Sequence, residues 1–347
     1  MDLMKYLSHI TTVPGTSGYE KQVAEEFAKL FSPFCDEVTV DGTQSMIGVK
    51  HGTGNGPRVM LCAHMDEIGL MVSDIEEDGS IRLGSVGGVD PRILPASRVW
   101  VHGREKLFGM VGAKPPHLTP MKEREKNYKR EDLYVDVGLP ADKVRELVRP
   151  GDIVTFNTPS TELLNNQWAS KTMDDRACVT MLLVCAEKLS RMLCDADVYF
   201  VGTTQEEVGC MGAKTAAFSL KPDLAIALDV DHATIPGSRP DTTVDLDALN
   251  VTIGPFIQPK LCKRLTDCAA AHHVKLSTSV AGRFTYTDAD EVILSRAGVP
   301  TVLLSLPLKY MHTSVETIDL GVLEEGGRLM ANFVSELDAG WEEDLWI

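Results

Sequence analysis

The sequence predicts an α/β protein in which a small, mostly β module is inserted into one α/β domain. Its 347 residues allow about two domains with well-buried cores. From residue 172 onward, apolar runs alternate with helical patterns, as in an α/β layer. Between 73 and 163 the runs are short and are broken by Gly, Pro and charged loops, which indicates a β module. We therefore expect one domain over 1–72 plus 164–347 and an inserted domain over 73–163.

The elements of the α/β domain follow from local patterns, taken in chain order. Residues 17–31 place apolar side chains at helical spacing after a Ser/Glu start and predict an amphipathic helix. Apolar runs at 59–62 and 68–72 flank polar residues, which predicts a buried strand that opens onto a site. A long apolar helix is expected from 174, and a last helix near 320–337. Further strands are expected in the apolar runs at 196–204, 223–230, 249–254 and 301–306.

Composition excludes several classes of partner. The chain has 50 Asp and Glu against 34 Lys and Arg, a formal net charge of −16, which argues against nucleic acid and anionic membranes as partners. The first ten residues do not have the pattern of a signal peptide, and no window approaches the ~18 apolar residues of a membrane span. The eight cysteines form no Cys-x-x-Cys pair, which favours reduced, buried thiols. We therefore expect a cytoplasmic protein.

Acids and histidines recur in five short motifs, each at the end of a predicted strand or at the adjoining helix start. They are His64 with Asp66, Asp174 in Asp174-Asp175-Arg176, Glu206 with Glu207, Asp229, and His312. Each motif has an ordinary alternative: a chance His-x-Asp, a helix dipole, a solvated loop, an N-cap or a satisfied core histidine. Ligand sites of α/β sheets lie at the carboxyl ends of the strands. Together the five motifs predict a metal site.

The spacing of these residues suits metal chemistry. A separation of two on a strand places His64 and Asp66 on one face, where the carboxylate can orient the imidazole. Of the adjacent pair Glu206 and Glu207, one can bind a metal while its neighbour deprotonates the attacking water.

Two of the motifs leave the choice of residue less clear. One carboxylate of the Asp-Asp pair at 174–175 can bridge two cations. Asp229 lies nearest the buried run of its strand and is preferred, although Asp231 and His232 follow it directly and compete for the same role.

In order along the chain, these and further motifs resemble the M42 family of metallo-aminopeptidases. The similar stretches are AHMDEIG at 63–69, KPPHL at 114–118, DDR at 174–176, QEEVG at 205–209, LDVDHA at 228–233, IGPFI at 253–257, TDA at 287–289, and SRAGVPT and KYMHTSVE near the end. The resemblance implies a mixed-sheet, zinc-peptidase-like α/β/α catalytic domain with an inserted barrel-like dimerisation domain. It also implies hydrolysis of short peptides, and dimers that assemble into a dodecamer.

The resemblance further implies two divalent metal ions per subunit, zinc or cobalt. His64 and Asp229 would hold one, Glu207 and His312 the other, and Asp174 would bridge them. Asp66 would orient His64, and Glu206 would be the general base.

Three alternatives stay open on the sequence. The stretch 285–291 departs from the family pattern, and Asp290 or Glu291 could favour a basic N-terminal residue or could simply be a solvated helix turn. Glycoside hydrolysis would need a pair of carboxylates without metals, and it leaves the histidines without a role. A non-catalytic peptide-binding scaffold of the same fold is the third possibility.

Overall fold

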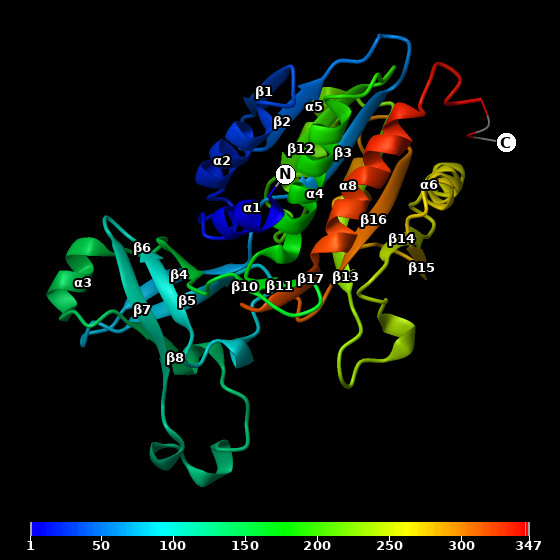
Figure 1. The fold of residues 1–347 in the computed structure, drawn as a ribbon. Helices are drawn as coiled ribbons and strands as arrows, with labels where there is room; N and C mark the ends of the chain where they lie inside the picture. The colour runs from blue at the N-terminus through cyan, green and yellow to red at the C-terminus, as the bar shows by residue number, and fades with distance from the viewer. Residues whose placement is uncertain (1, 344, 346–347) are drawn as a thin grey trace.

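The protein, described in a computed structural model over residues 2–343 and 345, is built on one eight-stranded mixed sheet (Figure 1). The strands lie in the order β1-β2-β12-β3-β13-β16-β14-β15. Their bounds are β1 Glu37–Val40, β2 Met46–Lys50, β3 Arg58–His64, β12 Asp197–Thr203, β13 Leu224–His232, β14 Leu249–Ile253, β15 Leu276–Val280 and β16 Thr301–Leu308. The central strands β12, β3, β13 and β16 are parallel to their neighbours within this group. Their carboxyl ends therefore meet at one edge.

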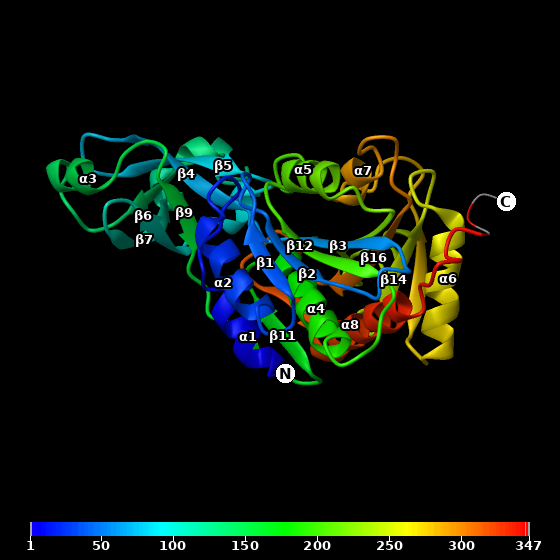
Figure 2. The same cartoon turned by 90° about the horizontal axis from the view of Figure 1, so that it is seen from above.

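Helices cover both faces of this sheet, which gives the three-layer α/β/α arrangement. Figure 2 shows α4 and α8 on one face and α5 and α7 on the other. The helices are α1 Leu3–Ile10, α2 Lys21–Phe31, α4 Met173–Leu189, α5 Met211–Leu220, α6 Pro259–Ala271, α7 Ala289–Val292 and α8 Leu320–Ser335. Helix α4 is apolar on all sides because it lies between the sheet and α8. A small sheet of β10 Thr161–Glu162, β11 Gln167–Ser170 and β17 Glu316–Asp319 lies near its start.

A closed six-stranded barrel stands beside the large sheet, at the opposite end of the molecule from α6 (Figures 1 and 2). Its strands are β4 Gly69–Ile75, β5 Ile81–Val86, β6 Arg98–His102, β7 Lys106–Ala113, β8 Leu133–Asp136 and β9 Ile153–Phe156, and α3 Ala141–Leu147 packs beside it. The interior is filled by alternating aliphatic side chains of these strands. Closure leaves the barrel without open strand edges.

The predicted fold class, a mixed α/β/α domain with an inserted β-rich barrel, is confirmed. The first barrel strand begins at Gly69, so the apolar run at 68–72 lies in the barrel rather than in the large sheet, and the last barrel strand ends at Phe156. The division at 72/73 and 163/164 into a catalytic and a dimerisation domain stays a prediction. Residues 1, 344 and 346–347 of the predicted catalytic domain lie outside the described residues.

Candidate metal centre

The predicted site residues lie at or near the carboxyl ends of the four parallel strands β3, β12, β13 and β16 and at the start of α4. His64 is the last residue of β3, and the loop after β12 carries Glu206 and Glu207. Asp229 lies on β13, and His312 follows β16. The middle of β3, β12 and β13 is mostly apolar and buried, and acids and histidines appear toward this edge. Strand burial therefore explains why the reactive groups converge there.

Asp174, at the start of α4, lies between two imidazoles. Its Oδ1 is 3.0 Å from Nε2 of His64, and its Oδ2 is 3.2 Å from Nε2 of His312. Although burial opposes it, contact with the two histidines holds the pKa of Asp174 well below its usual range. One carboxylate that presents an oxygen to each of two histidines has the arrangement that a bridging ligand needs.

Both imidazoles have strongly raised pKa values. Burial alone would lower the pKa of His64, but hydrogen bonds with Asp174 and Asp66 and the charge of Glu206 raise it well above the ordinary value. Contact with Asp174 and Glu207 raises the pKa of His312 to about 11. The carboxylates around these rings therefore attract positive charge, which a proton or a metal ion can supply.

The adjacent acids Glu206 and Glu207 point to different partners. Oε1 of Glu207 is 3.4 Å from Nε2 of His312, whereas Oε2 of Glu206 is 3.9 Å from Nε2 of His64. Burial raises the pKa of Glu206 to about 8, with further increases from Asp288, Glu207 and Asp174, while His64 opposes them. Burial and the charge of Asp174 also raise the pKa of Glu207. These side chains lie in a place where negative charge is already in excess.

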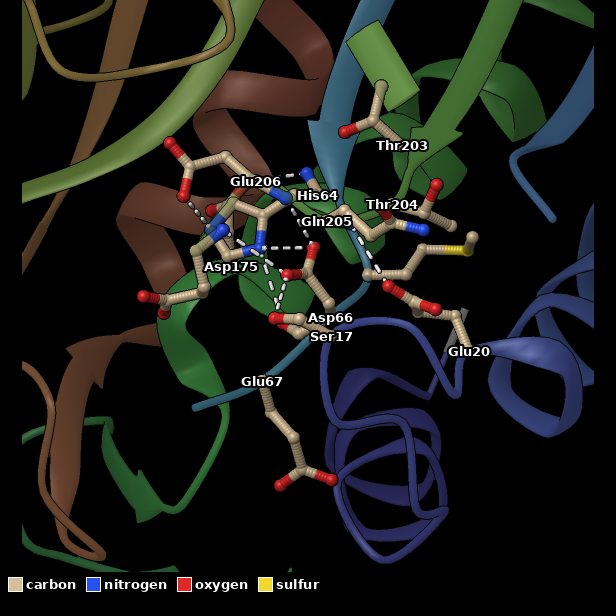
Figure 3. Close-up of polar contacts among 12 residues, drawn as sticks. Ser17, Glu20, His64, Asp66, Glu67, Asp175, Thr203, Thr204, Gln205 and Glu206 are labelled. Atoms are coloured by element: carbon tan, nitrogen blue, oxygen red, sulfur yellow. Dashed lines mark hydrogen bonds and ion pairs between the residues drawn. The ribbon is translucent and has the colours of Figure 1, made fainter. Parts of the chain in front are cut away.

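Asp66 is fully buried beneath His64 (Figure 3). Its Oδ1 is 3.5 Å from Nδ1 of His64, and Ser17 Oγ donates to its Oδ2 at 2.6 Å. The backbone amides of Glu206 and Glu207 also donate to the Asp66 carboxylate, at 3.1 and 3.2 Å. Because these donors bind the charged form, the pKa of Asp66 is lowered despite burial. One carboxylate thus fixes both the imidazole and the loop that carries the two glutamates.

Asp229 is also close to His64, together with Asp175, the second carboxylate of the Asp-Asp pair. Ligand atoms of His64, Asp175 and Asp229 lie within 4.8 Å of one another. Oδ1 of Asp175 is buried without a hydrogen-bond partner among the described residues. Burial and the charge of Asp175 raise the pKa of Asp229 well above its ordinary value. These two carboxylates need a cation near them to stay charged.

Two more buried acids belong to the site and were missed. Glu316, on β17, accepts from the backbone amides of Asp174 at 3.1 Å and His312 at 2.9 Å. Asp288 accepts from Thr203 Oγ1 at 2.5 Å, and its other oxygen has no partner among the described residues. The stretches TDA at 287–289 and KYMHTSVE at 309–316 contain these two acids, but the sequence assigns a role to neither of them; Glu316 lies within a four-residue strand.

The barrel contributes two glycines to the wall of this site. Gly87 and Gly88 follow β5 and pack against Glu207 and His312. A Cβ atom on Gly88 would lie 2.6 Å from Nδ1 of His312. The imidazole can occupy its position only because position 88 carries no side chain.

The two buried basic side chains near the site form ion pairs with Glu67, which is not one of the predicted ligands. Arg176 and Lys171 are buried and pair with Glu67, at 3.4 and 2.5 Å. In Figure 3 the Glu67 side chain points away from His64 and Asp66. Among the described residues, the ion pairs of Asp174 and Glu207 are made with histidines alone. The cluster of acids is therefore left without a fixed side-chain cation of its own.

The donor set fits divalent metal ions of the zinc type. Imidazole nitrogens and carboxylate oxygens are ordinary zinc ligands. A second group, His64, Asp174 and Glu207, also has its ligand atoms within 4.8 Å of one another. The raised pKa values of Asp229 and Glu207 and the unpartnered buried oxygen of Asp175 mark a place where a cation would be stabilised. The residues present therefore fit the group that the sequence predicts.

The other sequence candidates have different roles. His232 is exposed. Asp290 accepts from the amides of Thr285 and Tyr286, at 2.9 and 2.8 Å, and so closes a turn. Glu291 pairs with Lys214 at 2.7 Å. Because both acids are already engaged, the suggestion that one of them receives a basic substrate residue is not supported.

Comparison with known proteins identifies the family of this chain. The family model described as M42 glutamyl aminopeptidase matches residues 44–329. A lysyl aminopeptidase of Pyrococcus furiosus is 34% identical over 97% of both chains. The chain therefore belongs to the M42 family of aminopeptidases, whose peptidases depend on metal ions.

Solved structures show the same architecture. A TET aminopeptidase from a marine sediment Thaumarchaeota archaeon superposes with a TM-score of 0.94, at 28% identity over 99% of this chain and 98% of that one. The TET1 peptidase of Pyrococcus horikoshii, which can assemble into a tetrahedron or a large octahedral shell, gives 0.83 at 29% identity, covering 97% and 100%. A further structure, PhTET1-12s, contains a dodecamer. Within residues 2–343 and 345, no helix is both long and apolar enough to cross a membrane.

Proposed function

We propose that this chain is a metal-dependent aminopeptidase that releases N-terminal residues from short peptides at a centre of two divalent ions, zinc or cobalt. The observation that carries the proposal is Asp174, which presents one oxygen to His64 and the other to His312. Asp229 lies on the His64 side and Glu207 on the His312 side. The assignment predicted from the sequence, one ion at each side with Asp174 between, fits these positions.

When bound, the two ions would polarise the scissile carbonyl and acidify a water molecule. Glu206 accepts the proton of that water and passes it to the leaving amine. It suits this role because its Oε2 lies 3.9 Å from Nε2 of His64, beside the proposed ligands, and because its side chain is only 11% exposed. Asp66 keeps His64 and the backbone of Glu206 in register through one carboxylate. The excess of carboxylates attracts the protonated amino terminus of a peptide.

Substitution of Glu206 by Gln tests the proposal. We expect kcat on amino-acid anilides to fall ~10²- to 10⁴-fold, because the proton acceptor is lost while the shape is kept. Elemental analysis should find the same metal content as in the unmodified protein. Glu291→Gln is the matched control, because this glutamate only pairs with exposed Lys214 and should retain nearly full activity. Unchanged turnover in Glu206→Gln would contradict the role of the base.

The two alternative functions make different demands on the same residues. A glycoside hydrolase would release reducing sugar from carboxymethyl-cellulose after chelation, since its carboxylates act without metals. A peptide-binding scaffold would contain no stoichiometric metal. The site favours neither alternative, because His64 and His312 both point at a carboxylate that lies between them.

We also propose that the barrel makes a dimer contact and that dimers assemble into a dodecamer. Phe108 and Met110 lie two positions apart on barrel strand β7, so they share one face, and at 44% and 41% exposed they offer an apolar pair for such a contact. PhTET1 supplies the precedent for the dodecamer. A monomer mass by light scattering at working concentration would contradict this assembly.

The expected compartment is the cytoplasm. All eight cysteines are free thiols, and six of them are buried. Such thiols persist in a reducing compartment. Recovery of disulfide-linked protein from cells quenched with an alkylating reagent would contradict this expectation.

A further inference from the structure

A second feature of the large sheet is a cavity of about 540 Å³ over β13, β16, β14 and β15. The loop between β13 and β14, yellow-green in Figure 1, forms one wall. The segment after β15 forms another through Phe284, Thr285 and Thr287. The volume lies within the range of small-molecule sites, ~300 to 1,000 Å³. A long amino-acid side chain can be accommodated in such a space.

The cavity adjoins the proposed metal centre on two sides. Asp229 and Asp231 are two positions apart on β13, so their side chains share one face of the strand. Ser305, which is paired in register with Asp229 on the neighbouring strand, lines the cavity. On the other side Thr287 lines the cavity and is followed by Asp288, which lies beside Glu206. A substrate at the metal centre can therefore extend its first side chain into this space.

The charge of the lining is one-sided. Two aspartates line the cavity, and none of the lining residues is Lys, Arg or His. Asp241 is already neutralised, because Arg239 donates to its Oδ1 at 3.1 Å and to its Oδ2 at 2.5 Å, and both side chains are exposed. Among the described residues, Asp231 pairs with no Lys or Arg. It is the carboxylate in this cavity that can receive a cation from outside.

Asp231 is held in place by a buried polar network. Nδ2 of Asn250, a fully buried residue of β14, donates to Asp231 Oδ2 at 2.9 Å and to Ser279 Oγ at 2.8 Å. Ser277 Oγ donates to the side-chain oxygen Oδ1 of Asn250 at 3.1 Å, which fixes the orientation of the side-chain amide. A carboxylate fixed by such a network recognises a charge without first losing rotamer freedom.

We propose that Asp231 selects substrates whose first residue is Lys or Arg, with the cationic end of that side chain paired to the Asp231 carboxylate. The methylene stem would lie against Leu303 and Phe284, two of the apolar residues of the lining. The inference rests on the proposed function, because it assigns the substrate class of that site.

The test compares kcat/KM on Lys-, Arg-, Leu- and Glu-anilides for the oligomeric, metal-loaded protein and for Asp231→Asn. Unmodified protein should prefer Lys and Arg over Leu and Glu. In Asp231→Asn the ratio of kcat/KM for Lys to that for Leu should fall at least tenfold. Asp241→Asn is the matched control, since it removes a carboxylate from the same cavity that Arg239 already neutralises, and its ratio should change less than twofold. Elemental analysis checks that each variant retains its metal.

Each contrary outcome has its own meaning. If the unmodified protein hydrolyses Leu or Glu substrates best, the assignment of Asp231 is wrong while the proposed function stands. An equal loss on all four substrates in Asp231→Asn would mean that Asp231 supports Asp229 rather than selecting substrate, which also overturns the inference. If the unmodified protein hydrolyses none of the four, the proposed function itself fails.

Discussion

The α/β domain and the barrel differ in what they bury. Barrel strands enclose aliphatic side chains and Phe156, and Thr155 is the buried polar side chain among the described barrel residues. The α/β domain buries an apolar core as well, but it also buries Arg176 and Lys171 and the acids of the candidate metal centre. Burial of apolar surface suffices to hold the barrel together. The α/β domain must compensate its buried charges, which it does through ion pairs and, in our proposal, through metal ions.

The two regions also meet at the site. Gly87 and Gly88 of the barrel segment touch Glu207 and His312 of the α/β domain. The barrel is therefore part of the wall around the reactive groups as well as the proposed contact surface. Substitutions in one region, each compared with a control substitution, therefore test how the two regions differ.

The largest expected difference concerns buried and exposed arginines. Arg176 donates to the carbonyl oxygens of Met65, Ile10 and Val13 at 2.9, 2.8 and 2.6 Å, and it pairs with Glu67. Arg176→Met should lower the free energy of unfolding by about 3 to 5 kcal/mol, because it leaves buried acceptors without a partner.

On the barrel, Arg82 is half-exposed and pairs with Glu76. Arg82→Met should cost about 1 kcal/mol or less, because surface ion pairs contribute little. Hydrogen exchange resolved by region measures both effects. A cost for Arg176→Met no greater than that for Arg82→Met would show that the buried charges are not structural.

A smaller effect is expected from a methyl group at the junction of the two regions. In Gly88→Ala the new Cβ would lie 2.6 Å from Nδ1 of His312, so the imidazole must move. We expect a loss of roughly tenfold in kcat/KM, together with weaker metal retention, because a ligand displaced by about 1 Å binds poorly.

Gly84→Ala, on the same strand-loop unit, is the control. Its Cβ would meet only the Met71 carbonyl oxygen, at 3.8 Å. Activity is compared at equal metal concentration. If both variants behave alike, the glycine at 88 is not needed for the placement of His312.

The smallest effect concerns pH and the barrel. Burial and the charge of Lys106 lower the pKa of His102 from 6.5 to about 4, and its Nε2 lies 2.9 Å from Thr155 Oγ1. Protonation therefore favours the unfolded barrel, so its stability is complete above pH 6.5 and falls as the pH decreases toward 4. With partial solvent screening we expect about 1 kcal/mol between pH 7 and 5.

His102→Gln should remove that pH dependence. His51→Gln, which changes an exposed histidine of the α/β domain, should not alter it. The measurement is hydrogen exchange of the barrel strands across the pH range. A profile that is the same in His102→Gln as in the unmodified protein would mean that another group titrates.

The convergence of several polar residues could be predicted from the sequence, because the same pattern, a polar residue after an apolar run, recurs along the chain. His64, Glu206 and Asp229 each follow an apolar run, and parallel strands bring the ends of such runs together. Glu316 could not be found in this way, because it acts by accepting backbone amides and lies within a very short strand.

Other features depend on side-chain direction, which sequence position does not give. Asp290 and Glu291 suggested a charged pocket, but they face the turn at Thr285 and Lys214. In the sequence Asp231 is only an alternative to Asp229 as a metal ligand. The structure places it in the lining of the cavity, where Asn250 of β14 donates to it. The sequence assigns the run at 68–72 to the α/β domain, but β4 lies in the barrel, because an apolar run alone does not indicate which sheet it joins.

Metal titration tests the central claim most directly. The protein is stripped with a chelator, its metal content is checked, and hydrolysis of an amino-acid anilide is followed while Zn²⁺ or Co²⁺ is added. The account predicts no measurable turnover without metal and a plateau at about two equivalents per chain, one for each side of Asp174. Full activity in the metal-free protein would contradict it.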